Sequence, residues 1–334
     1  MATQRQILAQ IDALEPSIAR AFLAAVADMR DGARINALSA AIAAGDLERA
    51  AQLAGITPGA WANVTESTRR AYAVGGGFTA GDAPVALGFK FDMNNPRAER
   101  WLRDHSSGFV TRINDDQLDA IRETVNAGTA AGRNPRATAL DIVGRVNRTT
   151  KRRTGGIVGL SEPQARYVTT ARAELLSGDP DLMQNYLTRT RRDHRFDGVV
   201  RRAIADGRAV ASADVDRLVG RYADRLLQTR GNAIARTEAI NAFNEAADES
   251  LRQAIDQGHL NPESVVRIWD DVGDIRTRAS HRSMDGQERG VNEPFQAPDG
   301  SLLMHPGDSS LGAPPEQVIQ CRCTVRHDVD WIEQ

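Results

Sequence analysis

Two cysteines in the C-terminal part of this chain could bind a metal ion together with histidines, although their spacing does not match a standard zinc finger. Cys321 and Cys323 are the only cysteines, and the residues around them alternate between apolar and polar in a pattern typical of a strand. Residues i and i+2 of a strand point to the same side, so both sulfurs could face one point. Two thiolates and two histidines make a tetrahedral structural zinc site, with His281 and His305 as the candidate partners and His327 in reserve. The default interpretation is two small buried residues on a core strand, and the zinc site is the alternative.

A charged group just before these cysteines could carry acid–base chemistry. Arg278 and His281 are three positions apart and would share a helix face, and Asp274 and Arg276 precede them. Histidine as acid or base, with arginine holding an oxyanion, could act on a phosphodiester. No partner carboxylate has a diagnostic spacing, so an ion-pair network that stabilises a small module is the favoured interpretation.

The strongest basic patch lies in a Gly-rich stretch that we expect to be a loop. Its members are Arg145, Arg148, Lys151, Arg152 and Arg153. A solvated loop is the default interpretation, and contact with DNA is the alternative. Lysine occurs only at Lys90 and Lys151, so arginine is abundant throughout and an Arg-rich stretch is weak evidence for nucleic-acid binding.

The elements that must position these residues are mostly helices. Apolar residues at spacings of three and four predict a helix over residues 3–30, with a kink or break at Pro16, and a longer helix over about 212–249. Ser161 and Gln164 have the spacing of a capping box.

Beyond residue 255 the pattern changes to short strands and turns, which predicts a mainly α fold with a small α+β C-terminal module. We expect three segments: an N-terminal helical segment at 1–90, an elongated α-helical body at 91–255 and the module at 256–334. The first segment ends in a predicted glycine-rich linker at Gly75–Pro84.

Composition excludes several classes of protein. Hydrophobic residues make up 41% and charged residues 26%, which is ordinary for a globular protein. No apolar run is long enough for a transmembrane helix, and two cysteines cannot form a disulfide framework. The formal net charge of -2 gives no global basic field that would attract nucleic acid.

Short motifs in a fixed order identify a family between residues 235 and 323. They include Arg236, Glu238, Asn241, Trp269, Asp274, Arg276, Arg278, Asp285, Gly286, the His305-Pro306-Gly307-Asp308 turn and Cys321-Arg322-Cys323. Together they resemble the phage head morphogenesis family, the minor head proteins similar to protein F of phage Mu.

The resemblance implies a minor capsid protein without catalytic residues. It would be a structural adaptor near the portal that acts in head assembly and in genome packaging or delivery. The implied partners are the portal protein, head shell proteins and packaged DNA, with no membrane, and the basic patch becomes a candidate contact for DNA or portal. The implied location is the host cytoplasm during assembly and then the virion.

Two other functions remain open from the sequence. One is a nuclease or toxin-like effector enzyme that uses the C-terminal module. The other is a DNA-binding internal protein, which a steep salt dependence of duplex binding would support.

Overall fold

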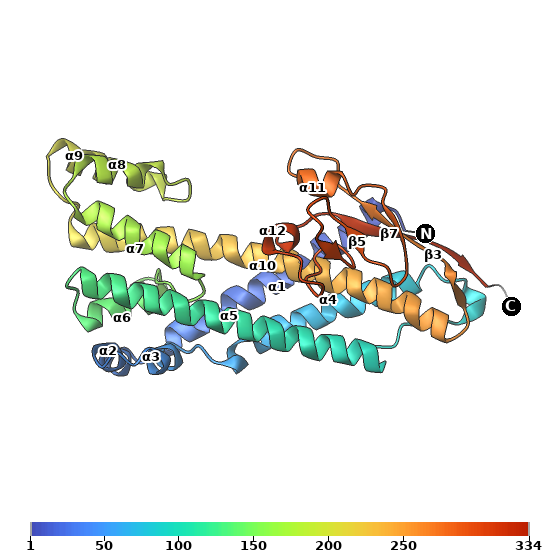
Figure 1. Ribbon diagram of the computed structural model, residues 1–334. Coiled ribbons are helices and arrows are strands. Elements are labelled where there is room, and N and C mark those ends of the chain that lie inside the picture. Colours follow the sequence, from blue (N-terminus) through green and yellow to red (C-terminus); the bar gives the residue numbers. More distant parts are fainter. Residues whose placement is uncertain (1, 333–334) are drawn as a thin grey trace. The chain divides into compact units, whose positions relative to one another are not determined.

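A computed structural model describes residues 2–332 of the protein. The structure is 62% helical and 9% strand, which confirms the prediction of a mainly α fold with a small mixed C-terminal region (Figure 1). Across the described residues, no helix combines the length and the hydropathy that a membrane span needs.

The chain forms two compact units, each assembled from separate stretches. The first unit comprises residues 1–21, 63–107 and 231–334, and the second comprises residues 22–62 and 108–230. This arrangement differs from the three consecutive segments expected from the sequence. Whether those segments fold independently stays a prediction.

Four long helices contribute residues to both units. They are α1 (Gln4–Gly32), α4 (Ala62–Ala80), α5 (Pro96–Ala130) and α10 (Ser212–Asp256). The predicted helices at 3–30 and 212–249 are therefore confirmed. A break at Pro16 is wrong, because α1 continues through this residue. Proline removes one helical hydrogen bond, and the fully buried Ile11 and Ile18 on either side hold the helix in place.

Shorter helices and one small hairpin complete the second unit. They are α2 (Ile35–Ala43), α3 (Leu47–Leu53), η1 (Pro58–Trp61), α6 (Pro135–Val143), β1 (Arg145–Val146), β2 (Arg153–Thr154), α7 (Glu162–Leu176), α8 (Pro180–Thr188), η3 (His194–Phe196) and α9 (Asp197–Ala205). The capping box of Ser161 and Gln164 is present at the start of α7. Trp61 is fully buried and stacks on Phe22 with ring centroids 5.6 Å apart.

The predicted glycine-rich linker is wrong, because Gly75, Gly76 and Gly77 lie inside α4. A Cβ atom at Gly75 would lie 2.3 Å from the carbonyl oxygen of Phe243, and one at Gly76 would lie 2.2 Å from the ring of Phe91. These two glycines are buried and allow close packing in the first unit. A run of glycines that allows close packing between segments looks the same in the sequence as a run of glycines in a flexible linker.

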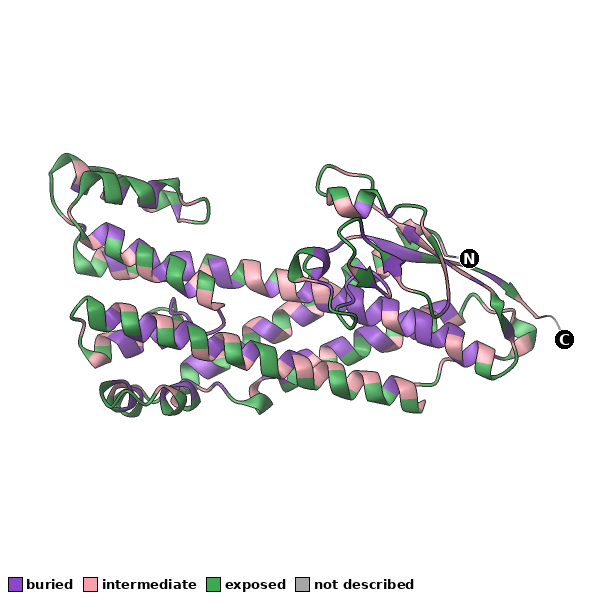
Figure 2. Ribbon diagram, viewed as in Figure 1, coloured by how far each residue is buried: buried purple, intermediate pink, exposed green. Residues whose placement is uncertain are grey.

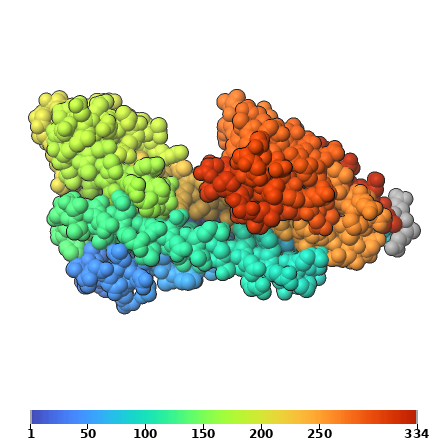
Figure 3. Space-filling model, in the orientation of Figure 1, coloured from blue at the N-terminus to red at the C-terminus, as the bar shows by residue number. Residues whose placement is uncertain are grey.

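The C-terminal module belongs to the first unit and contains a three-stranded antiparallel sheet. Its order is β4 (Glu288–Gly290), β3 (Leu260–Asp270) and β7 (Thr324–Trp331). The remaining elements of the first unit after α4 are η2 (Val85–Leu87), α11 (Ala279–Arg282), α12 (Pro315–Val318) and the hairpin of β5 (Phe295–Gln296) and β6 (Leu302–Leu303). Residues of the module form one continuous orange and red patch of surface in Figure 3.

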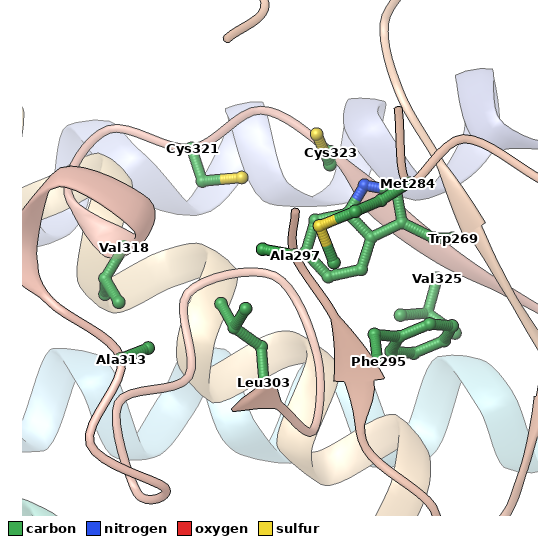
Figure 4. Close-up of a cluster of buried hydrophobic side chains, with 10 residues drawn as sticks. All are labelled: Trp269, Met284, Phe295, Ala297, Leu303, Ala313, Val318, Cys321, Cys323 and Val325. Atoms are coloured by element: carbon green, nitrogen blue, oxygen red, sulfur yellow. The ribbon is translucent and has the colours of Figure 1, made fainter. Parts of the chain in front are cut away.

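The module has a small core of its own and a buried helix beside it. The core comprises Trp269, Met284, Phe295, Ala297, Leu303, Ala313, Val318, Cys321, Cys323 and Val325 (Figure 4). In α10, residues 239–251 are almost all buried, as Figure 2 shows. Within the first unit, the module and α4 both pack against this stretch of α10, through contacts such as Asn244 with Pro306 and Phe243 with Phe78.

Candidate functional site

The two cysteines lie in an irregular segment between α12 and β7. The strand begins later than expected, because β7 starts only at Thr324 and leaves both cysteines outside it. Gln320 has a positive φ of 56°, which turns the chain out of α12, and its backbone N–H donates to Thr237 Oγ1 of α10 at 3.0 Å. Cys321 and Cys323 are nevertheless both buried, at 1% and 2% exposure, with the half-buried Arg322 between them. Both cysteine side chains therefore point into the core, as predicted, although this segment does not pair with another strand.

His281 of α11 meets both sulfurs with a single ring nitrogen. Its Nδ1 lies 3.4 Å from Cys321 Sγ and 3.5 Å from Cys323 Sγ. One ligand atom from each of the three side chains lies within 4.8 Å of the others, and all three side chains are buried. The structure thus brings together three of the four residues proposed from the sequence as zinc ligands.

A hydrogen-bonded chain behind His281 fixes its tautomer. Gln317 Oε1 lies 3.0 Å from His281 Nε2 and also accepts from Ser280 Oγ at 3.0 Å, while Gln317 Nε2 donates to Asp299 Oδ2 at 2.7 Å. Since the Gln317 oxygen faces the ring, Nε2 carries the proton. Nδ1 then presents its lone pair to the two sulfurs.

The two thiols influence each other's ionisation. Their mutual hydrogen bond lowers the pKa of Cys321 against the effect of burial, and His281 lowers it further. The same bond and burial raise the pKa of Cys323, which the Trp269 indole N–H partly counteracts. Figure 4 shows the Trp269 nitrogen on the Cys323 side of the core, where it has no conventional hydrogen-bond partner.

His305, the fourth proposed zinc ligand, does not join this group. Its Nε2 lies 3.2 Å from Glu245 Oε2 of α10, and its Nδ1 lies 3.2 Å from the Pro306 carbonyl oxygen. Both ring nitrogens therefore face acceptors. Burial would lower the pKa of His305, but Glu245, Asp308 and Asp248 outweigh burial and raise it. The reserve residue His327 is also engaged elsewhere, with Nε2 3.0 Å from Asp248 Oδ1.

The charged group proposed for acid–base chemistry serves the fold of the module. Asp274 pairs with Arg322 and accepts from the backbone N–H groups of Arg276 and Thr277 at 2.9 and 3.1 Å. The Arg322 guanidinium holds the pKa of Asp274 well below its usual range. Arg278 is the N-cap residue of α11, and its side chain donates to the Ile319 carbonyl oxygen. These side chains join the α11 region to the cysteine segment.

A buried arginine that sequence reasoning missed attaches the module to α10. Arg267 of β3 is fully buried and donates to Asp248 Oδ2 and to the Met304 carbonyl oxygen, each at 2.7 Å. It also donates to the carbonyl oxygens of Gly290, at 3.0 Å, and Glu293. Burial would raise the pKa of Asp248, but Arg267 and then His327 hold it well below its usual range.

The sequence did contain a signal for this arginine. Val265, Arg267 and Trp269 alternate along β3 and all face inward. A charged residue at the inward position of an apolar alternation predicts a buried ion pair. His327 is the register partner of Arg267 on β7, which explains why both reach the same carboxylate.

The motif residues on α10 contact other parts of the first unit. Arg236 pairs with Glu15 at 2.7 Å and Asp12 at 3.1 Å, and Glu238 Oε2 lies 2.7 Å from His105 Nε2.

The other motif residues shape turns of the module. The backbone of Gly307, with φ of +91°, lies against Asn241, where a Cβ would be 3.1 Å from the Asn241 nitrogen. Asp285 accepts from the Asp271 N–H at 2.9 Å, and Gly286 has a φ of +73° in the turn before β4. Most of the motif residues therefore make contacts that stabilise the module and its packing against α10.

The basic patch lies in the second unit, around the β1–β2 hairpin. Arg145 pairs with Asp216 at 3.0 Å and with Asp141 at 3.1 Å. Arg152 pairs with Asp31 at 2.6 Å and Asp28 at 3.1 Å.

Another member of the patch, Arg153, donates to the Gly144 carbonyl oxygen at 3.0 Å. Arg148 and Lys151 are exposed. Much of the patch's charge is neutralised within the unit, and its contact with DNA or portal stays a prediction.

Comparison with known proteins shows a similarity to a protein family in the C-terminal part of the chain. Residues 189–326 match the family model described as phage Mu protein F like protein. The matched region contains α9, α10, Arg267, His281 and the two cysteines, and it excludes the basic patch. No curated protein and no solved structure gives a significant match.

Proposed function

We propose that this chain, whose residues 189–326 belong to the phage Mu F-like family of head morphogenesis proteins, is a structural adaptor of the phage head. In this proposal it is a minor capsid component near the portal and acts in head assembly and in genome packaging or delivery. The family match carries the proposal.

The chemistry of the module supports a structural role. The charged motif residues are engaged in holding the module together, as with Asp274 and Arg322, or in attaching it to α10, as with Arg267 and Asp248. His281, the residue best suited to acid–base catalysis, is only 1% exposed, so a polymeric substrate cannot reach it. Catalysis needs a reacting group within hydrogen-bond distance of the substrate.

Assembly with the portal protein tests the adaptor role. The full chain would be co-expressed with portal and shell proteins of the same phage and analysed by size-exclusion chromatography. Co-elution with the portal protein is expected. Elution of a folded chain apart from both partners would contradict the proposal.

Arg148 and Lys151, two exposed cations of the basic patch, are the candidates for a contact with DNA or portal. The double variant Arg148→Glu/Lys151→Glu should weaken portal co-elution or duplex binding, whereas Arg69→Glu, at an exposed position of the first unit, should change neither. A duplex contact would also show a strong dependence on salt concentration. Equal behaviour of both variants would remove the patch from the proposal.

The enzyme alternative has its own assay. The purified chain would be incubated with single-stranded and duplex RNA and DNA, and no cleavage is expected. Cleavage by the wild type that disappears in His281→Ala would favour the effector enzyme over the adaptor.

A further inference from the structure

We propose that His281, Cys321 and Cys323 bind one zinc ion and that Gln317 positions the histidine for it. The site would be structural and would lie within the core of the C-terminal module. It differs from the four-residue set suggested by the sequence, because His305 is excluded. The proposal is independent of the adaptor role, since a zinc-stabilised module could serve any function.

The distances match those required around zinc. With Zn–S bonds of about 2.3 Å and Zn–N bonds of about 2.0–2.1 Å, a tetrahedral site separates a sulfur from a nitrogen by about 3.5 Å. The observed separations from His281 Nδ1 are 3.4 Å to Cys321 Sγ and 3.5 Å to Cys323 Sγ. A cation can therefore bind between the three atoms with little movement of the backbone.

Cys321 Sγ and Cys323 Sγ both lie close to His281 Nδ1, and hydrogen bonding alone does not explain this arrangement. The Nδ1 lone pair of a neutral imidazole accepts one strong hydrogen bond, so at most one thiol can use it fully. A cation placed between the three atoms satisfies both sulfurs and the nitrogen together. Zinc prefers this set of thiolate and imidazole ligands.

The surroundings are those of a metal-bound histidine. Such a histidine donates its other N–H to an oxygen acceptor, which fixes the tautomer and the ring orientation. His281 Nε2 faces Gln317 Oε1 at 3.0 Å, and Asp299 holds the Gln317 amide group from its other end at 2.7 Å. Gln317 is itself buried, at 6% exposure, so its orientation is constrained.

The indole N–H of Trp269 supplies a second, independent observation. It is buried without a hydrogen-bond partner, and Figure 4 shows its nitrogen on the Cys323 side of the core. An N–H group near a sulfur stabilises a thiolate better than a neutral thiol. A zinc-bound Cys323 thiolate would give this donor an acceptor.

The ion would join parts of the module that are distant in sequence. His281 lies 40 residues from Cys321 and 42 from Cys323. It follows β3, whereas the cysteines precede β7, so zinc would join the α11 region to the segment that enters the paired strand β7.

Metal content and cobalt spectroscopy test the site on the full chain. The protein would be purified without chelator, and zinc would be measured by elemental analysis. About one zinc per chain is expected. Replacement of zinc by Co²⁺ should give a sulfur-to-cobalt charge-transfer band. This band appears only when a thiolate binds the metal, so it tests cysteine coordination directly. Less than a tenth of an equivalent of zinc after incubation with the metal, or no such band, would overturn the proposal.

Matched variants identify the ligands. Cys321→Ser, Cys323→Ser and His281→Ala should each lose most of the zinc, whereas His305→Ala and His327→Ala should retain it. Circular dichroism would accompany each measurement to show that α10 and the other helices remain. Zinc retained by all three ligand variants, or lost equally from the two control variants, would contradict the assignment.

Zinc affinity tests the positioning role of Gln317 separately. Gln317→Leu removes the acceptor for His281 Nε2 and should weaken zinc affinity about 10–100-fold, as loss of such partners does. The double variant Gln317→Glu/Asp299→Asn keeps an oxygen acceptor for His281 and replaces the Asp299 carboxylate by an amide, so it should restore most of the affinity. Competition with a chromogenic chelator would measure both values. Equal affinities for wild type and Gln317→Leu would show that Gln317 has no positioning role.

Discussion

Each unit contains an aspartate paired with arginine, but the two aspartates differ in burial and in the number of their arginine partners. In the first unit a single pair, Arg267 and Asp248, lies in the interior at 0% and 1% side-chain exposure. In the second unit three arginines surround one carboxylate, Asp141, at 2.8–3.1 Å. One of those arginines, Arg145, keeps 32% of its side chain exposed. We expect the burial of an ion pair, more than the number of pairs around a carboxylate, to determine how much free energy of unfolding is lost when the pair is removed.

Removal of Arg267 should have the largest effect. Arg267→Ala leaves Asp248 charged and buried without its main partner, so the free energy of unfolding should fall by about 3–5 kcal/mol. Urea unfolding would measure the loss, and hydrogen exchange should show it first in β3 and β7.

The matched change in the second unit is Arg145→Ala. Asp141 keeps two other arginines, Arg133 and Arg172, so the loss should be about 0–1 kcal/mol. If Arg145→Ala destabilised the chain as much as Arg267→Ala, burial would not be what separates the two clusters.

Gly75→Ala should have the second largest effect. The new methyl group would meet the Phe243 carbonyl oxygen at 2.3 Å, and backbone cannot move aside as a side chain can. We expect a loss of about 1–3 kcal/mol in the free energy of unfolding.

Two control glycines sharpen this prediction. Gly128→Ala in the second unit meets the Thr138 side chain at 2.7 Å, so it should cost less. Gly77→Ala, with no neighbour within 4 Å, should stabilise α4 by up to about 1 kcal/mol. Thermal melts of the three variants give the order, and a neutral Gly75→Ala would restore the linker interpretation.

His305 should make the first unit sensitive to pH. Its folded-state pKa lies above the unfolded value, so its stabilisation is fully present below about pH 6.5 and is lost as pH rises through the folded pKa. The groups that face it are Glu245, Asp248 and Asp308. Urea midpoints of wild type should fall across this window relative to those of His305→Gln. Parallel pH profiles for the two proteins would contradict the assignment.

Among the described residues, the two non-glycine positions with positive φ should give the smallest effects. Gln320 has a φ of 56° in the first unit, and Lys151 has a φ of 60° in the second. Asparagine tolerates this conformation better than either residue. Gln320→Asn and Lys151→Asn should each raise the free energy of unfolding by up to about 1 kcal/mol, measured by thermal melting. Destabilisation by both would show that neither backbone conformation carries strain.

Periodicity predicted most of the helical fold, and it failed where distant contacts determine the conformation. The helices around 3–30 and 212–249 follow from local apolar spacing, and the cap at Ser161 from local chemistry. The conformation of Gly75 depends on Phe243, which is far away in sequence, so no local pattern could distinguish packing from a linker. The strand predicted around Cys321 starts later because Gln320 turns the chain to reach Thr237 of α10.

The candidate site was predictable in part. The spacing of Cys321 and Cys323 and the presence of His281 were visible in the sequence. The choice between His281 and His305 depended on which histidine met a carboxylate, and Glu245 could be identified only in the fold. Gln317 gave no sequence signal, because its role comes from a hydrogen bond across 36 residues.

Incorporation into heads tests the central claim most directly. Heads assembled from co-expressed portal protein, shell protein and this chain would be purified by density gradient, and their content would be measured by quantitative mass spectrometry. The account predicts that the chain sediments with the heads at a low, fixed ratio to the portal protein and that Arg267→Ala, whose module is destabilised, reduces that ratio. Heads that form normally and contain none of the folded wild-type chain would contradict the account.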